Sequence, residues 1–334
     1  MMWQLVQDEL LAFYGGKSKL TELSDLTIDT LYGSMWGLNY RYMTLSDALM
    51  ENRKAMISYS LQRIDKLIGH PNFTFKERQI PRCRVGYGTY GWKYDKKIIK
   101  LAIKKASIID TAEGYGYGKV ETELGKILKD SAPVEIMTKV RRDHMSPLAI
   151  RAAVVRSNVK LNTVPHVQLH FPNNKYPDAV KDLVTLRQFN FIKSIGLSNC
   201  SIDMIEYSQI FLSEYSGDVI STVQMAFNML NNRISKTFLP YCQKRGIVVL
   251  AYSPLGQKFD KLKSPLLSKI AKKYNSSQAQ VALAWILSFN GVIPIPNTNN
   301  VNHFKENILS NDLHLDQNDV LELTNYYNEN RETN

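Results

Sequence analysis

The sequence predicts an α/β fold, a (β/α)8 TIM barrel with an N-terminal helical extension. Short apolar runs rich in β-branched residues alternate with amphipathic helical runs, and this alternation occurs eight times. The eight units fill the roughly 250 residues that such a barrel needs. Mostly continuous apolar strands between helices indicate a parallel sheet covered by helices. A doubly wound open sheet is the alternative, but the run Gly86-x-Gly88-x-x-Gly91 ends before the expected helix 95–105, so this motif does not open the first helix.

The order of elements along the chain supports the barrel. The predicted strands are 84–90, 107–112, 134–140, 166–171, 191–199, 219–226, 247–252 and 292–296. A helix is expected behind each strand, including 95–105, 120–128, 147–160 and 177–188, with one near Ser264 and the last starting near Asn302. We therefore expect a barrel domain over 73–330.

Residues 1–72 do not follow this alternation. Two helical stretches are predicted there, 3–14 and 46–68, and Ile57, Leu61 and Ile64 recur at helical spacing in the second. We expect a helical extension that packs on the barrel, covers the pocket mouth, or mediates self-association or binding of a protein partner.

Composition restricts the class of protein. Apolar residues make up 44% and charged residues 22%, which is ordinary for a globular chain. No apolar run is long enough to span a membrane, and the start of the chain lacks the features of a secretory signal. The three scattered cysteines, Cys83, Cys200 and Cys242, are expected to be reduced thiols in a cytoplasmic protein.

The net charge of +11 does not predict nucleic-acid binding. The positive residues are spread over helices such as 95–105, where apolar residues at helical spacing alternate with lysines. This pattern is typical of a solvated helix face and not of a basic arm with stacking aromatics. A positive field also favours the approach of an anionic dinucleotide.

Four titratable residues are predicted at the same end of consecutive strands. Asp110, Lys139 and His170 stand at the carboxyl ends of the second, third and fourth strands, and Tyr115 follows in the loop after Asp110. Each alone has a common structural explanation, such as a loop anchor for Asp110 or a buried structural histidine for His170. Chemistry in such barrels lies at this end, so the four together predict an active site.

These residues and their neighbours resemble the aldo-keto reductase superfamily from about residue 73 to 327. The run Asp110-Thr-Ala-x-x-Tyr115-Gly-x-Gly118 is similar to the family's Asp/Tyr signature. Lys139 in Met-Thr-Lys-Val and His170 in Gln-Leu-His-Phe-Pro match the two remaining catalytic positions, in the family's order. The resemblance implies a carbonyl reductase or alcohol dehydrogenase that uses a nicotinamide cofactor on a small-molecule carbonyl substrate.

Other motifs resemble the family's cofactor site. They are Ile195-Gly-Leu-Ser-Asn199, Leu250-Ala-Tyr252-Ser-Pro-Leu-Gly256 and Ile293-Pro-Ile-Pro-Asn-Thr298, the last followed by Glu306-Asn307. The cofactor-binding residues that this implies are Ser198, Asn199, Gln224, Tyr252, Ser253, Leu255, Asn297, Thr298, His303, Glu306 and Asn307. No metal site is expected, because the strand ends carry no cluster with metal-ligand spacing.

The last motif departs from the family at two positions. Members that prefer NADPH carry a basic residue and an arginine where this chain has Asn297 and His303. A neutral amide and an imidazole pair less strongly with the 2′-phosphate than a bidentate arginine does. We expect NADPH, with NADH as the alternative, because Thr298, Asn299 and Asn300 can still donate to a phosphate.

Carbonyl reduction requires a hydride on carbon and a proton on oxygen. A free tyrosine has a pKa of about 10, and a nearby ammonium lowers it by stabilising the phenolate. Tyr115 is the expected proton donor, with Lys139 beside it, Asp110 holding Lys139, and His170 orienting the substrate oxygen. The hydride must come from the cofactor, because no side chain supplies one.

The segment after Gly256 is short, so long substrate-gripping loops are not expected there. The wall of the substrate pocket is instead expected from four aromatic residues: Tyr90, Trp92, Phe171 and Phe227. Two other functions remain open. One is a cofactor-binding regulatory or scaffold subunit that has lost turnover, and the other is a metal- or Schiff-base-dependent barrel enzyme.

Overall fold

The computed structural model describes residues 83–215 and 219–330. The predicted extension and its two helices lie outside these residues and stay predictions. Eight strands are present, in a single sheet in sequence order from β1 to β8, and every neighbouring pair is parallel. They are β1 (Tyr87–Gly88), β2 (Ile109–Asp110), β3 (Ile136–Val140), β4 (His166–Leu169), β5 (Ile195–Ser198), β6 (Ile220–Ala226), β7 (Val248–Tyr252) and β8 (Val292–Pro294).

The sheet closes on itself through the backbone around β8 and β1. Gly86 N donates to Pro294 O at 2.9 Å, and Gly88 N donates to Pro296 O at 3.1 Å. Proline has no N–H to donate in return, so this junction is bonded in one direction only. The prediction of a (β/α)8 barrel is therefore confirmed, and β1 is shorter than expected because its bonding to β8 is incomplete.

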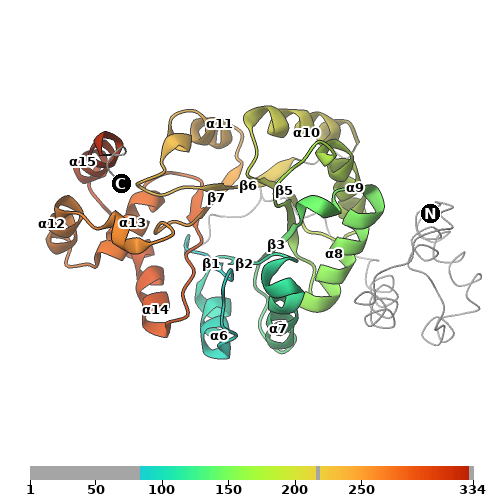
Figure 1. Cartoon of the computed structure of the whole chain (residues 1–334), viewed down its shortest axis with the longest axis horizontal. Helices are drawn as coiled ribbons and strands as arrows, with labels where there is room; N and C mark the ends of the chain where they lie inside the picture. Colours follow the sequence, from blue (N-terminus) through green and yellow to red (C-terminus); the bar gives the residue numbers. More distant parts are fainter. Residues whose placement is uncertain (1–82, 216–218, 331–334) are drawn as a thin grey trace, which may run out of the picture. The chain divides into compact units, whose positions relative to one another are not determined.

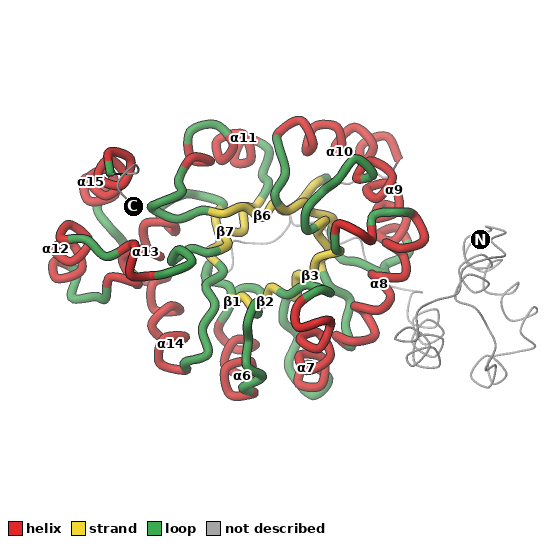
Figure 2. The backbone as a smooth tube through the Cα atoms, in the orientation of Figure 1, coloured by secondary structure: helices red, strands yellow, loops and turns green. Residues whose placement is uncertain are grey.

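Helices surround the strands (Figures 1 and 2). They are α6 (Lys96–Lys105), α7 (Lys119–Leu128), α8 (Pro147–Leu161), α9 (Tyr176–Gln188), α10 (Ile202–Tyr215), α11 (Phe238–Lys244), α12 (Pro265–Lys273), α13 (Gln278–Leu287), α14 (Val301–Leu309) and α15 (Gln317–Glu329). None of these helices, within the described ranges, is long and apolar enough to cross a membrane.

Two helices, α12 and α13, separate β7 from β8, where simple alternation provides for one. Helix α13 begins with a capping box, in which Ser277 Oγ accepts from Gln280 N and the Gln280 side chain accepts from Ser277 N. Its residues 281–287 are all buried. Because residues 281–287 have no solvent-facing stripe, this part of α13 lies deeper in the fold than an amphipathic barrel helix.

Amphipathic packing explains the outer layer. In α6, Ile98, Ile99 and Ala102 are fully buried against Tyr87 and Ile109 of the strands, while the lysines face outward. Burying an aliphatic side chain of this kind contributes about 1.5–3 kcal/mol. The lysines of α6 therefore form a solvated face, as the sequence indicated.

A polar cluster ties together the amino-terminal ends of three strands. Glu135 precedes β3, His166 begins β4, and Ser194 precedes β5. His166 is fully buried, with Nδ1 2.7 Å from Ser194 Oγ and Nε2 2.7 Å from Glu135 Oε2. Lys193 Nζ donates to the same Glu135 oxygen at 2.9 Å. This end of the barrel lies opposite the tetrad of Asp110, Tyr115, Lys139 and His170, so the cluster contributes to stability.

Replacing Glu135 with glutamine is expected to lower the free energy of unfolding at pH 7 by about 1–3 kcal/mol, as for a lost charged hydrogen bond. Burial raises the pKa of Glu135, but His166 and Lys193 outweigh it and hold that pKa well below its ordinary value. A carboxyl with a depressed folded pKa stabilises above its unfolded pKa of about 4.3 and loses this contribution as pH falls below it. Urea denaturation should therefore show the wild-type advantage at pH 7 shrinking at pH 4. Glu123→Gln, at an exposed pair, is the control and should change little.

Candidate active site

The strands place the tetrad at one end of the barrel. Asp110 is the last residue of β2, Lys139 is the second-last of β3, and His170 follows β4 directly. His170 N donates to Val140 O at 2.9 Å, which fixes the backbone of this strand end. Because parallel strands end at the same edge, residues far apart in the sequence converge there.

Tyr115 reaches this edge from a tight loop. It begins a 3-10 turn, Tyr115–Gly118, in which Gly116, Tyr117 and Gly118 all have positive φ. Glycine adopts this conformation at no steric cost, whereas a tyrosine in it is unusual. The loop is held to β3, since Glu113 N donates to Lys139 O at 3.2 Å and the Glu113 carboxylate accepts from Arg141 N at 2.7 Å.

The Lys139 ammonium is the centre of the site. It is fully buried and donates to Asp110 Oδ2 at 2.8 Å, to Thr111 O at 2.7 Å and to the Tyr115 hydroxyl at 3.3 Å. An ammonium has three protons, and these three acceptors satisfy them all. The predicted pairing of Asp110 with Lys139, and of Lys139 with Tyr115, is present in the structure.

Charge within this group favours a protonated lysine beside a neutral phenol. Burial opposes the charge of Lys139, but Asp110 and Tyr115 outweigh it and raise the pKa of Lys139 above its ordinary value. Burial raises the pKa of Tyr115, and Lys139 opposes this only in part. The lysine therefore lowers the cost of the phenolate as expected, although burial has the larger effect and keeps the phenol protonated.

His170 is a neutral imidazole in this setting. Burial, together with the positive charge of Lys139, lowers the pKa of His170 to about 4. Its ring meets that of Tyr115 edge to face with centroids 5.9 Å apart, and stacks on Phe171 at 4.8 Å. A neutral imidazole carries one N–H donor, which is what a carbonyl oxygen beside Tyr115 requires.

Next to the tetrad, the ends of β5 and β7 are joined by side-chain hydrogen bonds. Asn199 Nδ2 donates to His170 O and to Ser198 Oγ, each at 3.0 Å. The Tyr252 hydroxyl donates to Asn199 Oδ1 at 2.8 Å, so the edge of its ring is fixed. Ser253 has a φ of 48° and turns the chain sharply after β7. Four residues predicted to bind the cofactor are therefore brought together beside His170.

Gln224, on β6, lies closer to the tetrad than its expected role suggests. Its Nε2 donates to Asp110 Oδ1 at 2.8 Å, on the oxygen that Lys139 does not use. This hydrogen bond lowers the pKa of Asp110, although burial, the largest influence, raises it. Gln224 thus contacts the Asp110 carboxylate directly.

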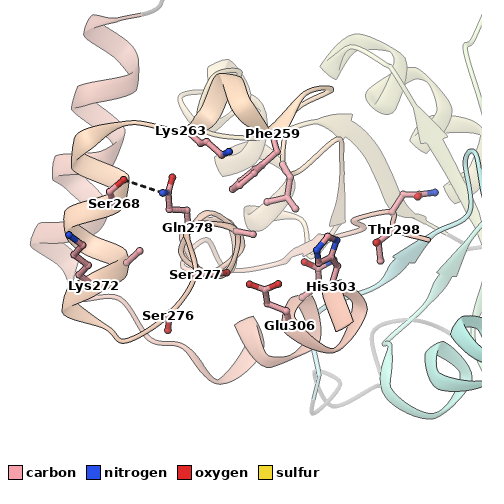
Figure 3. A pocket seen from close by; sticks show the side chains of 15 residues that line it. Phe259, Lys263, Ser268, Lys272, Ser276, Ser277, Gln278, Thr298, His303 and Glu306 are labelled. Atoms are coloured by element: carbon pink, nitrogen blue, oxygen red, sulfur yellow. Dashed lines mark hydrogen bonds between the residues drawn. The ribbon is translucent and has the colours of Figure 1, made fainter. Parts of the chain in front are cut away.

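A cavity of about 790 Å³ lies among the β7–α12 loop, α12, α13 and α14 (Figure 3). Six of the predicted cofactor residues line it: Leu255, Asn297, Thr298, His303, Glu306 and Asn307. In Figure 3, His303 and Glu306 from α14 face the start of α13 at Ser277. The structure thereby places the last motif and Leu255 in one cavity.

The cavity has a polar and an apolar portion. Phe259, Ala271 and Ala279 add apolar surface to that of Leu255, and Lys263 and Lys272 add positive charge. The two lysines and Phe259 were not predicted. They come from the β7–α12 loop and from α12, which the sequence motifs did not include, and only their clustering beside the last motif identifies them.

The four aromatic residues predicted for the substrate pocket separate into two pairs. Tyr90 is 75% exposed with its ring 5.2 Å from that of Tyr115, and Phe171 is 48% exposed against His170. Both therefore border the tetrad and keep exposed surface beside it.

The other two residues, Trp92 and Phe227, lie in packed layers, and their assignment to the substrate pocket stays a prediction. Trp92 is buried in the layer between the strands and α6, where its Nε1 donates to Asp95 O at 3.3 Å. Phe227 is fully buried against Trp285 and Phe289, with ring centroids 5.3 Å away in each case. Neither side chain is exposed beside the tetrad as Tyr90 and Phe171 are.

Comparison with known proteins agrees with this geometry. The model of the Aldo/keto reductase family matches residues 85–328, which is more than half of the chain, so the chain belongs to this family. Methylglyoxal reductase YeaE of Escherichia coli is 30% identical over 240 residues, covering 67% of this chain and 83% of YeaE. An uncharacterized oxidoreductase of Mycobacterium bovis, Mb2320, is 28% identical over 70% of this chain and 85% of its own.

Solved structures show the same fold. The thermostable aldo-keto reductase Tm1743 superimposes with a TM-score of 0.68 at 26% identity, covering 77% of this chain and 99% of its own. A variant of Gox0644 in complex with NADPH has a TM-score of 0.64 at 26% identity, covering 72% of this chain and 88% of its own.

Proposed function

On the basis of this family membership, we propose that the chain reduces an aldehyde or ketone to an alcohol with NADPH, and that Tyr115 donates the proton. The observation that carries the proposal is the buried Lys139 ammonium, which contacts both the Asp110 carboxylate and the Tyr115 hydroxyl. A buried charge is costly unless it is paired. The pair stabilises a tyrosinate, and a protein that only binds a cofactor does not need one, which argues against the scaffold alternative.

The reaction balances with one hydride and one proton. NADPH, when bound, supplies the hydride that the carbonyl carbon accepts. Tyr115 gives its phenolic proton to the carbonyl oxygen, and Lys139 stabilises the phenolate that remains. His170, neutral by its lowered pKa, donates a hydrogen bond that orients the same oxygen. Asp110 keeps the lysine in place throughout.

The cavity fits the adenosine end of such a cofactor. Leu255 and Phe259 offer apolar surface to a base, while Thr298, Asn297 and the lysines offer donors and positive charge to phosphate. Lys263 and Lys272 favour a 2′-phosphate, and hence NADPH over NADH, even though the last motif has no arginine. The bound NADPH in the Gox0644 structure supports this assignment by analogy.

The exposed rings of Tyr90 and Phe171 limit what approaches the tetrad. Two apolar faces next to Tyr115 and His170 favour planar or compact carbonyl compounds, which include aromatic aldehydes. The relative YeaE is described as a methylglyoxal reductase, so methylglyoxal belongs in the first panel of substrates.

The direct test is oxidation of NADPH and NADH by the purified full chain with methylglyoxal and a set of aromatic aldehydes. We expect turnover with at least one carbonyl compound, and a higher kcat/KM for NADPH than for NADH. Tight cofactor binding with no turnover on any substrate would contradict the proposal and favour the scaffold alternative.

Replacing His303 with arginine is expected to tighten binding of 2′,5′-ADP about tenfold, because a guanidinium pairs with phosphate through charged hydrogen bonds. Binding of 5′-AMP, which lacks the 2′-phosphate, should stay unchanged. Lys305→Arg is the matched control, since Lys305 lies on the same helix but does not line the cavity. Calorimetry measures all the affinities. If the variant bound both nucleotides equally more tightly, the 2′-phosphate would not lie beside residue 303.

A further inference from the structure

A chain of buried polar side chains crosses the barrel interior beneath the tetrad. Thr222 Oγ1 accepts from Gln168 Nε2 at 3.0 Å, and Gln168 Oε1 accepts from Gln224 Nε2 at 3.2 Å. Gln224 Nε2 also donates to Asp110 Oδ1 at 2.8 Å. All four side chains are at most 3% exposed. We call Thr222, Gln168 and Gln224 the amide relay.

The relay occupies positions that barrels ordinarily fill with aliphatic residues. Asp110, Gln168 and Gln224 come from β2, β4 and β6, which are alternate strands and so contribute to one interior layer. Burying uncharged polar groups costs free energy unless each finds a partner. Three buried polar side chains in one layer therefore point to a role beyond packing.

A glycine in β5 leaves the space that the relay needs. Gln168, Gly196 and Thr222 lie in one row across β4, β5 and β6. A Cβ at Gly196 would lie only 2.7 Å from Thr222 O and 2.9 Å from Gln168 Cγ, and it would collide with Thr222 Oγ1. Only glycine at position 196 therefore allows the threonine hydroxyl to reach Gln168 across the intervening strand.

The hydrogen bonds of Gln224 fix the orientation of its side-chain amide. Both protons of Gln224 Nε2 are used, one on Asp110 and one on Gln168. No residue in the described part of the chain donates to Gln224 Oε1. This oxygen keeps some accessible surface, so a ligand at the tetrad is able to supply its donor.

We propose that Gln168 and Thr222 are positioning residues, which hold Gln224 so that its Oε1 accepts a hydrogen bond from the carboxamide N–H of a bound nicotinamide. The inference rests on the proposed function, because it takes a nicotinamide nucleotide as the ligand. Without the second acceptor on Gln168, the Gln224 side chain is bonded only to Asp110 and turns about that single contact. Gln224 Oε1 is then no longer held in one direction.

The test compares NADP+ with its 3-acetylpyridine analogue, in which a methyl ketone replaces the carboxamide and removes the N–H donor. Calorimetry on the full chain should show that the wild type prefers NADP+ about tenfold, the scale of one hydrogen bond. In Gln168→Leu this preference should fall below about threefold. Binding of 2′,5′-ADP, which has no nicotinamide, should be unchanged.

Three further variants keep the result interpretable. Thr222→Val removes the hydroxyl at nearly constant shape and should reduce the preference in part, whereas Thr222→Ser keeps the hydroxyl and should retain it. This pair decides the question even if Gln168→Leu does not fold. Ser221→Ala removes a buried hydrogen bond to Ile195 O from the adjacent residue of β6 and should leave the preference intact.

An unchanged preference in Gln168→Leu and Thr222→Val, or an equal loss in Ser221→Ala, would overturn the inference alone. A folded wild type that binds NADP+ and its analogue no more tightly than 2′,5′-ADP would overturn the proposed function as well. The two failures are therefore distinguishable.

Discussion

Lys139→Met is expected to abolish measurable turnover and to lower the free energy of unfolding by about 3–5 kcal/mol. The substitution leaves the Asp110 carboxylate buried without its cation, and breaking a buried pair from one side carries a cost of this size. It also removes the charge that stabilises the Tyr115 phenolate. Denaturant unfolding and steady-state turnover on the same preparation measure the two effects.

A double-variant cycle separates the pair from general damage. Asp110→Asn in the Lys139→Met background removes the unpaired charge, so the double variant should be more stable than the sum of the two single losses predicts. Lys126→Met, at an exposed pair with Glu123, should leave stability almost unchanged. Additive losses at Asp110 and Lys139 would show that they are not coupled, contrary to the structure.

Tyr115→Phe is expected to reduce kcat at least about a hundredfold, the scale of a general acid. The phenyl ring keeps the contacts with Tyr90 and His170, so the fold and the affinity for cofactor should be retained. Only the phenolic proton and one of the three acceptors of Lys139 Nζ are lost. Turnover and the dissociation constant for NADPH, measured side by side, distinguish a chemical defect from a binding defect.

The same loop contains a matched control. Tyr117 lies two residues further on and is fully exposed, so Tyr117→Phe removes an identical hydroxyl from a place where it touches nothing catalytic. Its kcat should equal that of the wild type. A comparable loss in both variants would mean that the loop tolerates neither change and that Tyr115 is not the specific donor.

Much of the site was predictable because strand ends obey simple geometry. Asp110, Lys139 and His170 follow apolar runs, and parallel strands bring their carboxyl ends to one edge. The last motif was likewise predictable, and six of the expected residues share a single cavity. In both cases a side chain's place depends mainly on where its own strand or helix ends.

The burial of a side chain depends on distant partners and was less predictable. Trp92 and Phe227 stand near strand ends, as Tyr90 and Phe171 do, but residue type does not reveal which way a ring turns. Trp92 completes the layer beneath α6, and Phe227 fills space beside α13, a helix that simple alternation did not provide. Packing against elements remote in the sequence therefore determines that these two rings are buried.

The amide relay was missed for a related reason. Gln168 lies two residues before His170, so strand alternation places both side chains on the same face, and this signal was present in the sequence. That Thr222 reaches Gln168 depends on Gly196 in the strand between them. The residue pattern along one strand does not reveal that a glycine on the middle strand leaves space for a contact between its two neighbours.

Transfer of deuterium from 4-deuterated NADPH, prepared with both faces labelled, tests the central claim most directly. With a carbonyl compound that the wild type turns over, the account predicts one deuterium on the carbinol carbon of the product and none on its oxygen after exchange in ordinary water. Nuclear magnetic resonance of the product identifies the labelled position. Oxidation of the cofactor with an unlabelled carbinol carbon would contradict hydride transfer to the substrate at this site.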